Sequence, residues 1–529
     1  MTGTTAQPTS RARSWWGWGW ADAHPDDAEC AAMGALLPGT LARPLPVPRV
    51  RDLGIGSSAV QPPRSLARLV TADPADRAAH AMGKAYRDVM RALRGRPGRI
   101  PDLVARPLAD QDVAELLDWA GERRVAVVPY GGGSSVTGGV EYRGDEHRAV
   151  LSLDLTAMGR VLEVDAEGRS ARIQAGTLGP SLEDQLRPHG LTLRHFPQSF
   201  EFSTLGGWLA TRAGGHYATG RTHIDDFVQS MRVVSPAGTG ESWRLPASGA
   251  GPSPDRLFLG SEGALGIITE AWVRVQERPR HKASAAVSFA DFHDALRAVR
   301  ALAQCDLSPA NCRLLDAGEA ALSGAAQDGC AVLVLGFESA DEPVTGRLER
   351  AVALARSHGG RAEAAKGSGD AAVGAWRSAF LRMPYLRDGL ARMGAVAETF
   401  ETATTWDRIP GLIDAVRTEV GAAALKATGH PATVNCRLTH VYPDGAAPYF
   451  TVLAAGRPGD EVALWDDLKA VAGEVLHRHR ATITHHHAVG RDHRPDYDRQ
   501  RPEPFALALR AAKGALDPHG ILNPGVLVD

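Results

Sequence analysis

The spacing of apolar residues between positions 110 and 280 predicts short helices that alternate with short strands. Apolar residues at i, i+3, i+4 and i+7 share one face of a helix, and this pattern begins directly after Asp110, an acidic residue typical of a helix start. The apolar positions are Val113, Leu116, Leu117 and Ala120. The apolar run 125–128 follows and predicts a buried strand.

Further short elements are predicted up to residue 275. The predicted strands are 150–153, 161–164, 171–175 and 267–275, with a turn at 165–168 that joins two of them into a hairpin. The predicted helices are 181–187 and 205–213. Ser203 or Thr204 is expected to cap the second helix, because a side-chain oxygen can accept from the first free N–H groups.

From about residue 283 the elements become longer. The predicted strands are 285–289, 331–337, 395–405, 434–442 and 449–455. The predicted helices are 291–303, 344–358, 406–420, 460–479 and 504–516. The order of the elements before residue 480 favours an antiparallel sheet with helices on one face. Before residue 95, repeated prolines leave an extended arm and one helix, 75–93.

Charge and cysteine usage exclude several classes of protein. Lys plus Arg (59) nearly equal Asp plus Glu (61), so no overall field recruits nucleic acid or an anionic membrane. The five cysteines are scattered, which argues against a disulfide framework or a zinc ribbon and fits a reducing cytoplasm. No stretch approaches the ~20 apolar residues of a membrane span. The tryptophans between 15 and 20 suggest either contact with a membrane interface or packing of the arm onto the main body.

Three glycine-rich segments carry the strongest functional signal. They are 129–139, 201–208 and 259–270. Glycine lets the backbone approach a ligand closely, so that consecutive N–H groups can turn toward one phosphate. Three such segments predict one long dinucleotide held along its length. The first segment lacks the Gly-x-Gly-x-x-Gly motif and a following helix, which excludes a Rossmann fingerprint.

The run His485–His487 is the polar cluster in the chain that points most clearly to a chemical role. Imidazole titrates near neutral pH and can move protons. On a strand-like segment alternate residues share a face, so His485 and His487 are expected on one side and His486 on the other. Two alternatives stay open: a metal site completed by the nearby histidines at 477, 479 and 493, and a surface histidine cluster.

The order of these motifs resembles the flavin-binding superfamily of vanillyl-alcohol oxidase and p-cresol methylhydroxylase. The loop 131–136 is similar to that family's pyrophosphate loop, and 260–270 and 517–525 are similar to its other signatures. The resemblance implies an α+β fold, with a two-subdomain FAD-binding domain of the p-cresol methylhydroxylase type and a cap domain of antiparallel sheet and helices. Some members attach FAD through a histidine at this loop. Ser134 and Ser135 stand there, so non-covalent FAD is expected.

One branch, alkyldihydroxyacetonephosphate synthase, resembles much more of the chain. The similar stretches include 16–19, 99–102, 201–208, 385–388, 400–408, 436–439 and 485–490. Several lie outside the flavin-binding part, where FAD binding alone would not require them. The expected domains are an N-terminal arm and helix (1–95), the FAD-binding domain (96–280), the cap domain (281–480) and a C-terminal segment that returns to the flavin site (481–529).

The resemblance implies a role for particular residues. Proton transfer is expected from His486, His487 and Tyr449, and anion binding from Arg387 with help from Arg313. The residues expected to contact FAD are Pro129, Gly131, Gly132, Gly133, Ser134, Ser135, Val136, Pro197, Ser203, Thr204, Gly206, Gly207, Trp208, Thr211, Arg212, Glu262, Gly263, Gly266, Ile267 and Ile268. No metal is expected. Ala488 departs from the branch, which usually has glycine after the three histidines.

In this branch an acyl-dihydroxyacetone phosphate exchanges its acyl group for a fatty alcohol, through an adduct at flavin N5 and without net redox change. The resemblance therefore implies a lipid-phosphate substrate and a fatty alcohol as partners, and no nucleic acid. A cytoplasmic location is expected, while peripheral membrane contact and a homodimer are left open. The alternative is an FAD-dependent dehydrogenase of 2-hydroxy acids such as D-lactate. Such enzymes usually show a Gly-Glu-His-Gly-type motif where this chain has three histidines.

Overall fold

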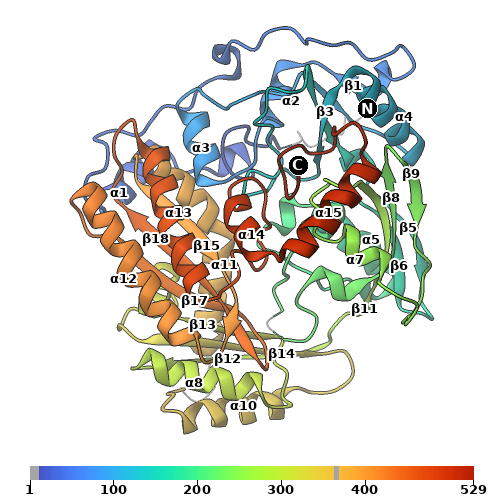
Figure 1. Ribbon diagram of the computed structural model, residues 1–529. Helices are drawn as coiled ribbons and strands as arrows, with labels where there is room; N and C mark the ends of the chain where they lie inside the picture. Colours follow the sequence, from blue (N-terminus) through green and yellow to red (C-terminus); the bar gives the residue numbers. More distant parts are fainter. Residues whose placement is uncertain (1–10, 218, 363–367) are drawn as a thin grey trace, which may run out of the picture.

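The computed structural model describes residues 11–217, 219–362 and 368–529, which form β-sheets and the helices around them (Figure 1). Two sheets from the first half of the chain share one apolar core. A larger sheet comes from the second half. This mixture of helices and mainly antiparallel sheets confirms the expected α+β class.

The first sheet has the strand order β1-β2-β4-β3. Its strands are β1 (Val70–Thr71), β2 (Leu103–Ala105), β3 (Val125–Tyr130) and β4 (Ala149–Asp154), and the last three run parallel. Helix α4 (Asp110–Arg123) packs on it through the apolar face that the spacing predicts. The C-terminal segment returns to this sheet, because Val127 N donates to Ile521 O (2.8 Å) and Asn523 N donates to Val127 O (2.8 Å).

The second sheet is antiparallel, with the order β5-β6-β10-β8-β9. Its strands are β5 (Val161–Asp165), β6 (Ser170–Gln174), β8 (Val228–Ser235), β9 (Gly238–Glu241) and β10 (Ile267–Arg274). The predicted hairpin is confirmed by the pairing of β5 with β6. The short strands β7 (Leu191–Thr192) and β11 (Gln276–Glu277) pair beside it. The helices of this part are α5 (Gly179–Leu186), α6 (Leu205–Thr211) and α7 (Pro254–Phe258).

The third sheet places hydrophobic and polar residues on opposite faces. Its strands are, in spatial order, β12 (His281–Phe289), β14 (Ala331–Ser339), β13 (Asn311–Leu315), β17 (Thr433–Val441), β18 (Gly445–Ala454) and β15 (Val396–Glu401), with β16 (Thr404–Thr405) also paired to β18. Successive side chains of a strand point to opposite faces. One face supplies apolar residues to the core, and the other carries arginine, threonine and tyrosine.

Helices cover the apolar face of the third sheet, as the pattern after residue 283 predicts (Figure 1). They are α8 (Phe292–Ala303), α10 (Thr345–Ser357), α12 (Ile409–Thr428) and α13 (Glu461–Arg478). Among the described residues between 281 and 480, three elements were not predicted: β13, α9 (Ala317–Ser323) and α11 (Ser368–Arg392). Helix α11 contains Pro384, a residue that normally marks a helix end, and this obscures the helix in the sequence.

The single helix predicted at 75–93 is wrong. The structure has two helices there, α2 (Pro74–Ala79) and α3 (Tyr86–Leu93). The break approaches the first glycine segment: Lys84 N donates to Ser135 O at 2.6 Å, and a Cβ on Gly83 would lie 2.2 Å from the same oxygen. A tertiary contact that local spacing does not encode therefore interrupts the helix.

The N-terminal arm packs onto the main body. It includes α1 (Asp27–Gly34), and Trp16 and Trp18 are buried; Trp18 packs with Phe202 and Tyr385. This agrees with the packing interpretation of the tryptophan cluster. All five cysteines are free, and among the described residues no helix combines the length and apolar character needed to span a membrane. The last helices are α14 (Arg494–Gln500) and α15 (Glu503–Leu516).

Candidate active site

A cavity of about 850 Å³ lies between the two smaller sheets and the third sheet. One side, which we call the glycine wall, consists of lining residues from the segments 129–136, 203–211 and 262–268. The opposite side, the side-chain wall, consists of lining residues from β13, β15, β17 and β18 together with His486 and His487. Every residue expected to contact FAD lines this cavity except Arg212, and all five expected catalytic residues line it.

The first loop of the glycine wall brings backbone N–H groups to the cavity. No acceptor on another described residue pairs with the N–H groups of residues 132–136. A Cβ on Gly132 would lie 1.6 Å from Phe202 O, and Gly133 has a φ of +68°, so both positions require glycine. A row of N–H groups at the wall of a cavity fits an anion such as a pyrophosphate.

The second loop meets the start of α6, as predicted. Thr204 Oγ1 accepts from Gly207 N at 3.2 Å, which confirms one of the two caps considered from the sequence. Ser203 Oγ instead accepts from the indole N–H of Trp208 at 2.7 Å and thereby orients a buried ring of the cavity wall.

Glu262 connects the glycine wall to the histidine segment. Its carboxylate is buried and accepts hydrogen bonds from Val489 N (2.9 Å) and Gly490 N (2.9 Å). The side chain of Asn523 donates to Glu262 O (2.7 Å) and to Gly139 O (3.0 Å), so the tail closes the same corner. Burial raises the pKa of Glu262 to about 7, against the opposing effect of the two N–H donors.

The side-chain wall takes its polar groups from adjacent strands. Arg313 lies on β13, Arg437 on β17 and Tyr449 on β18, and Arg437 is the register partner of Tyr449. Their neighbours Leu314 and Leu438 belong to the apolar core on the other face. Because strands alternate their side chains, residues more than 100 positions apart are brought to one surface.

Arg437 is a residue of this wall that the sequence analysis did not assign, although it lies in the quoted stretch 436–439. Its guanidinium stands 3.7 Å from the centre of the Tyr449 ring and donates to Glu319 Oε2 at 2.7 Å. Burial raises the pKa of the Tyr449 phenol, and the nearby Arg437 opposes that rise. Burial lowers the pKa of Arg313 to about 9, and the positive charge of Arg437 adds to this effect.

Glu401 organises the histidine run and was also missed, although it lies in the quoted stretch 400–408. Its carboxylate accepts from the backbone N–H groups of His485 (2.6 Å), His486 (3.0 Å) and His487 (2.8 Å), and from Thr484 Oγ1 (2.6 Å). Burial alone would raise the pKa of Glu401, but its close contacts with the three histidines and the hydrogen bond from Thr484 hold that pKa well below its ordinary value. The buried Glu401 carboxylate therefore fixes the backbone of His485–His487 by accepting hydrogen bonds from their three N–H groups.

The predicted alternation of the histidines is wrong. The segment 481–490 is not a strand, because its N–H groups turn toward Glu401 instead of pairing with a neighbouring strand. As a result His486 and His487 both line the cavity, and His485 does not. Burial lowers the pKa of His487 to about 3 and also lowers the pKa of His486, so both rings are neutral at neutral pH.

Arg387 reaches the cavity from α11. Its Nε and Nη2 donate to Asp388 Oδ1 (3.0 and 2.6 Å), and its Nη1 donates to Lys84 O (2.6 Å). Asp388 is fully buried and also accepts from Trp18 N at 2.6 Å, so the N-terminal arm helps to hold this arginine. Three of the five N–H groups of the guanidinium thus donate to the protein.

Arg212, which the sequence predicts to contact FAD, does not line the cavity. It ends α6 with a φ of +53°, and its Nε donates to Asp225 Oδ2 at 2.7 Å. Its side chain is 55% exposed, and Asp225 also pairs with Arg256. Because Asp225 holds the guanidinium in an ion pair, Arg212 lies outside the cavity wall.

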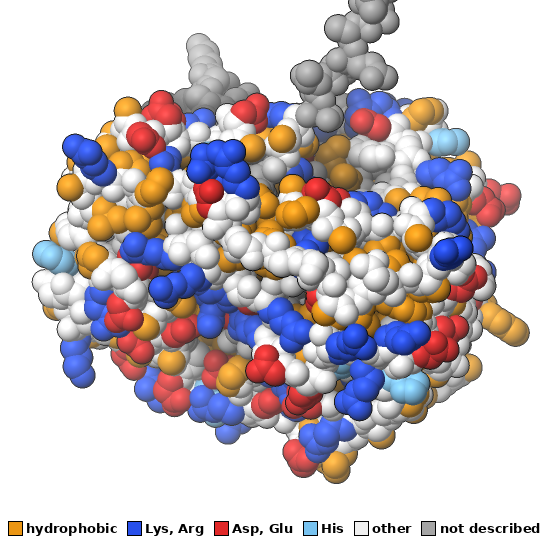
Figure 2. Space-filling view, turned by 90° about the horizontal axis from the view of Figure 1, so that it is seen from above, with side chains coloured by type: hydrophobic (Ala, Val, Ile, Leu, Met, Phe, Trp, Pro, Cys, Tyr) orange, Lys and Arg blue, Asp and Glu red, His pale blue; other side chains and the backbone are white. Residues whose placement is uncertain are grey.

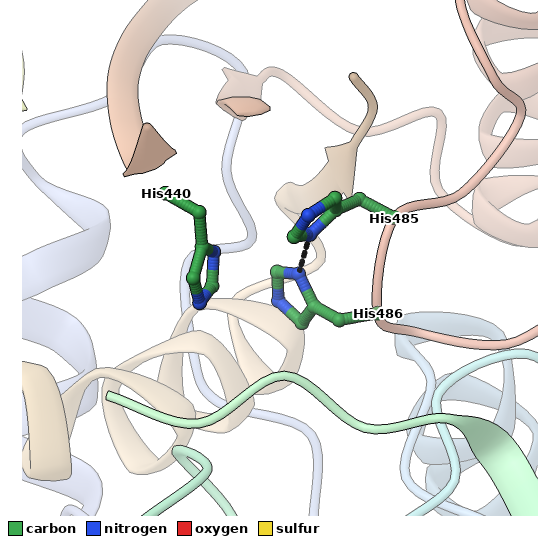
Figure 3. A group of neighbouring side chains, drawn as sticks. All are labelled: His440, His485 and His486. Atoms are coloured by element: carbon green, nitrogen blue, oxygen red, sulfur yellow. Dashed lines mark hydrogen bonds between the residues drawn. The ribbon is translucent and has the colours of Figure 1, made fainter. Parts of the chain in front are cut away.

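Two histidines of the cavity wall, His440 and His486, lie close to His485, and these three could hold a metal ion. His440, His485 and His486 each place a ring nitrogen within 4.8 Å of the others, and His485 Nδ1 lies 3.0 Å from His486 Nδ1 (Figure 3). This group differs from the one considered from the sequence, since it takes His440 from β17 in place of the histidines at 477, 479 and 493.

Comparisons with known proteins agree with this geometry. Residues 101–242 match the model of an FAD binding domain, and residues 278–527 match that of the FAD linked oxidases, C-terminal domain. An alkyldihydroxyacetonephosphate synthase from Trypanosoma brucei brucei is 32% identical over 479 residues, covering 85% of this chain and 77% of that protein.

Two solved structures show the same fold. An alkyldihydroxyacetonephosphate synthase superimposes with a TM-score of 0.81 at 24% identity, covering 97% of this chain and 98% of that one. The structure of p-cresol methylhydroxylase with substrate bound superimposes with a TM-score of 0.68 at 15% identity, covering 93% and 99%. The expected p-cresol methylhydroxylase type of fold is confirmed.

The fold, the glycine wall and the matched domains define an FAD-dependent enzyme of the FAD-linked oxidase class. The unpaired N–H row fits the negatively charged part of FAD, as argued above. Within this class, the chain belongs to the alkyldihydroxyacetonephosphate synthase family.

Proposed function

We propose that this enzyme replaces the acyl group of an acyl-dihydroxyacetone phosphate by a fatty alcohol. The observation that carries the proposal is that one cavity combines the glycine wall, three arginines, Tyr449 and three histidines with an apolar end. The apolar end is lined by Met33, Leu36, Leu37, Met383, Leu386 and Leu390. Bound FAD would supply an electrophilic ring, which no amino-acid side chain provides. We propose that FAD is held non-covalently, because Ser134 and Ser135 occupy the loop where some relatives have histidine.

The residues of this chain would bind the anionic groups and move protons. Guanidinium groups form paired hydrogen bonds with phosphate and carboxylate groups. Arg387, Arg313 and Arg437 would therefore bind the phosphate of the substrate and the carboxylate that leaves. His486 is neutral and lines the cavity, so it can accept a proton from the carbon beside a ketone. Tyr449 carries a phenol proton at neutral pH and can donate it.

A lipid substrate also supports peripheral contact with a membrane. Leu36 lies just after α1, is 83% exposed and lines the apolar end of the cavity, so it stands at the opening. We propose that this end meets a lipid surface. The view from above shows charges of both signs interspersed, in keeping with their near balance in the sequence, so contact would depend on apolar side chains (Figure 2). A cytoplasmic location stays a prediction from the sequence, which leaves the oligomeric state open.

Anaerobic mixing of the yellow holoenzyme with two substrate classes tests the proposed reaction. With acyl-dihydroxyacetone phosphate and labelled fatty alcohol, we expect labelled ether product, released fatty acid and no lasting flavin reduction. The dehydrogenase alternative predicts lasting reduction of the flavin by D-lactate. Reduction by D-lactate without any labelled ether product would overturn the proposal.

The anion site is tested separately by Arg387→Ala. Loss of a charge-assisted pair with phosphate should weaken substrate binding by about 1.5–3 kcal/mol, or roughly 10- to 100-fold. Arg382→Ala is the matched control, because it removes an exposed arginine from the same helix. Full activity of Arg387→Ala would remove this residue from the anion site.

A further inference from the structure

A line of contacts runs from the cavity through the histidine segment to the other side of the wall. His486 lines the cavity, and its Nδ1 lies 3.0 Å from His485 Nδ1 (Figure 3). On the far side of its ring, His485 Nε2 lies 3.1 Å from His223 Nε2. Three imidazole rings from two distant parts of the sequence are therefore connected in series by hydrogen-bond distances.

The outer end of this series lies near the surface. His223 is half-buried, and its Nδ1 contacts the carbonyl oxygen of Arg212, whose own side chain is 55% exposed. The middle ring is held in position by Tyr442, whose hydroxyl lies 2.6 Å from His485 Nε2 and 3.2 Å from Thr222 Oγ1. The inner end meets the reaction cavity, and the outer end is accessible to water.

The chemistry of imidazole suits such a series. A ring that receives a proton on one nitrogen can release another from its second nitrogen, so a proton can cross a histidine without the ring leaving its place. Burial keeps the pKa of His485 and of His486 below the ordinary value, and neutral rings do not trap a passing proton. When FAD and a lipid chain fill the cavity, bulk water has little direct access to its inner wall.

We propose that His486, His485 and His223 form a proton relay between the reaction cavity and solvent, with Tyr442 as a positioning residue. The proposal rests on the proposed function for the source of the proton, which is a carbon–hydrogen bond of the substrate. One proton enters His486, one N–H proton passes from His486 to His485 and one from His485 to His223, and water takes one from His223. Only N–H bonds are made and broken within the relay, and the reverse sequence returns a proton to the cavity.

The variant His223→Gln tests the relay, because glutamine preserves a hydrogen bond to His485 but does not accept and release protons near neutral pH. His477→Gln, which changes an exposed histidine on α13, is the control. The first measurement needs no substrate: hydrogen exchange between water and the ring N–H of His486 in the ¹⁵N-histidine-labelled holoenzyme. We expect exchange to slow about tenfold or more in His223→Gln and to stay unchanged in His477→Gln. An unchanged rate in His223→Gln would overturn the proposal.

The second measurement uses acyl-dihydroxyacetone phosphate in deuterated water. We expect His223→Gln to incorporate solvent deuterium into product about tenfold more slowly, with unchanged KM and flavin spectrum, and added imidazole should restore the rate. A loss that imidazole does not restore, or a bound metal at one equivalent whose removal by a chelator abolishes turnover, would count against the relay. If the wild type makes no ether product while His486 exchange still depends on His223, the proposed function fails and the relay stands.

Discussion

The two walls of the cavity are built in different ways. The glycine wall comes from three segments within residues 129–268, and its first loop presents backbone N–H groups. The side-chain wall comes from four strands and one loop spread over residues 313–487, and it presents arginine, tyrosine and histidine side chains. The glycine wall should therefore be sensitive to added volume, whereas the side-chain wall should be sensitive to the loss of a charged partner.

The largest effect is expected from added volume in the glycine wall. In Gly132→Ala the new Cβ would lie 1.6 Å from Phe202 O, so the backbone of the loop must shift. Overpacking of this kind costs about 1–3 kcal/mol, and we expect FAD affinity to fall about 10- to 100-fold, with loss of turnover wherever FAD is absent. Titration of the apoprotein with FAD, followed by flavin absorbance, measures the change.

Gly240→Ala is the matched control for this prediction. Gly240 lies in the exposed strand β9, and a Cβ there would meet no atom within 4 Å. It should bind FAD as the wild type does. If Gly132→Ala also bound FAD with wild-type affinity, the glycine wall would not be the FAD-binding surface that the comparison assumes.

The side-chain wall is best tested at Glu401, the partner of three histidine N–H groups. Glu401→Gln removes the charge and leaves a shape of similar size. Hydrogen bonds to a charged group contribute about 1.5–3 kcal/mol each, so we expect turnover to fall about 100-fold when the histidines move. FAD content should stay at one per chain, which is measured from the absorbance ratio of flavin to protein.

Thr484→Val provides the graded control, since it removes one of the bonds to Glu401 and keeps the three N–H groups in place. It should lose less activity than Glu401→Gln. Equal turnover of Glu401→Gln and the wild type would mean that the histidines do not depend on this carboxylate.

The two walls also differ in how well the sequence predicts them. The glycine wall could be predicted, because its function depends on residues that are close together in the chain and on a conformation that glycine allows. In the side-chain wall, the resemblance to the family was enough to predict Arg313 and Tyr449 as site residues. Arg437 and Glu401 were missed, because their significance arises only when Tyr449 and the histidine segment pack against them.

The errors have one physical cause. Local spacing predicted one helix at 75–93 and a strand through His485–His487. In both places a tertiary contact gives the backbone a different conformation from the one that local spacing favours. Ser135 O accepts a hydrogen bond from Lys84 N, and the Glu401 carboxylate accepts hydrogen bonds from the N–H groups of the three histidines. The helices over the third sheet were predicted well, because their apolar residues repeat with the helical period and are the residues that pack into the core.

An effect that depends on pH is expected where the two walls meet, at Glu262. Its folded pKa of about 7 lies above the ordinary 4.5, so the native state favours the protonated form. The stabilisation is complete below pH 4.5 and is lost as the pH rises to about 7, at up to about 1.4 kcal/mol per pH unit. Glu262→Gln cannot titrate, so the wild type should lose stability relative to this variant over that range. Urea unfolding of both holoenzymes at several pH values measures the difference, and parallel pH profiles would contradict the raised pKa.

The smallest effect concerns Ala488, the residue after the three histidines. Ala488 has a φ of +76° directly after the histidines, a conformation that costs a residue with a Cβ about 1–2 kcal/mol. Glycine avoids this cost but loses about 0.5–1 kcal/mol in chain entropy, so Ala488→Gly should stabilise the protein by about 0.5–1 kcal/mol. Ala422→Gly, in the exposed middle of α12, should instead destabilise it by about 1 kcal/mol. Thermal unfolding of both variants tests whether the two changes in stability have opposite signs. A lower melting temperature for Ala488→Gly would contradict the prediction and show that packing of the Ala488 methyl group outweighs the backbone strain.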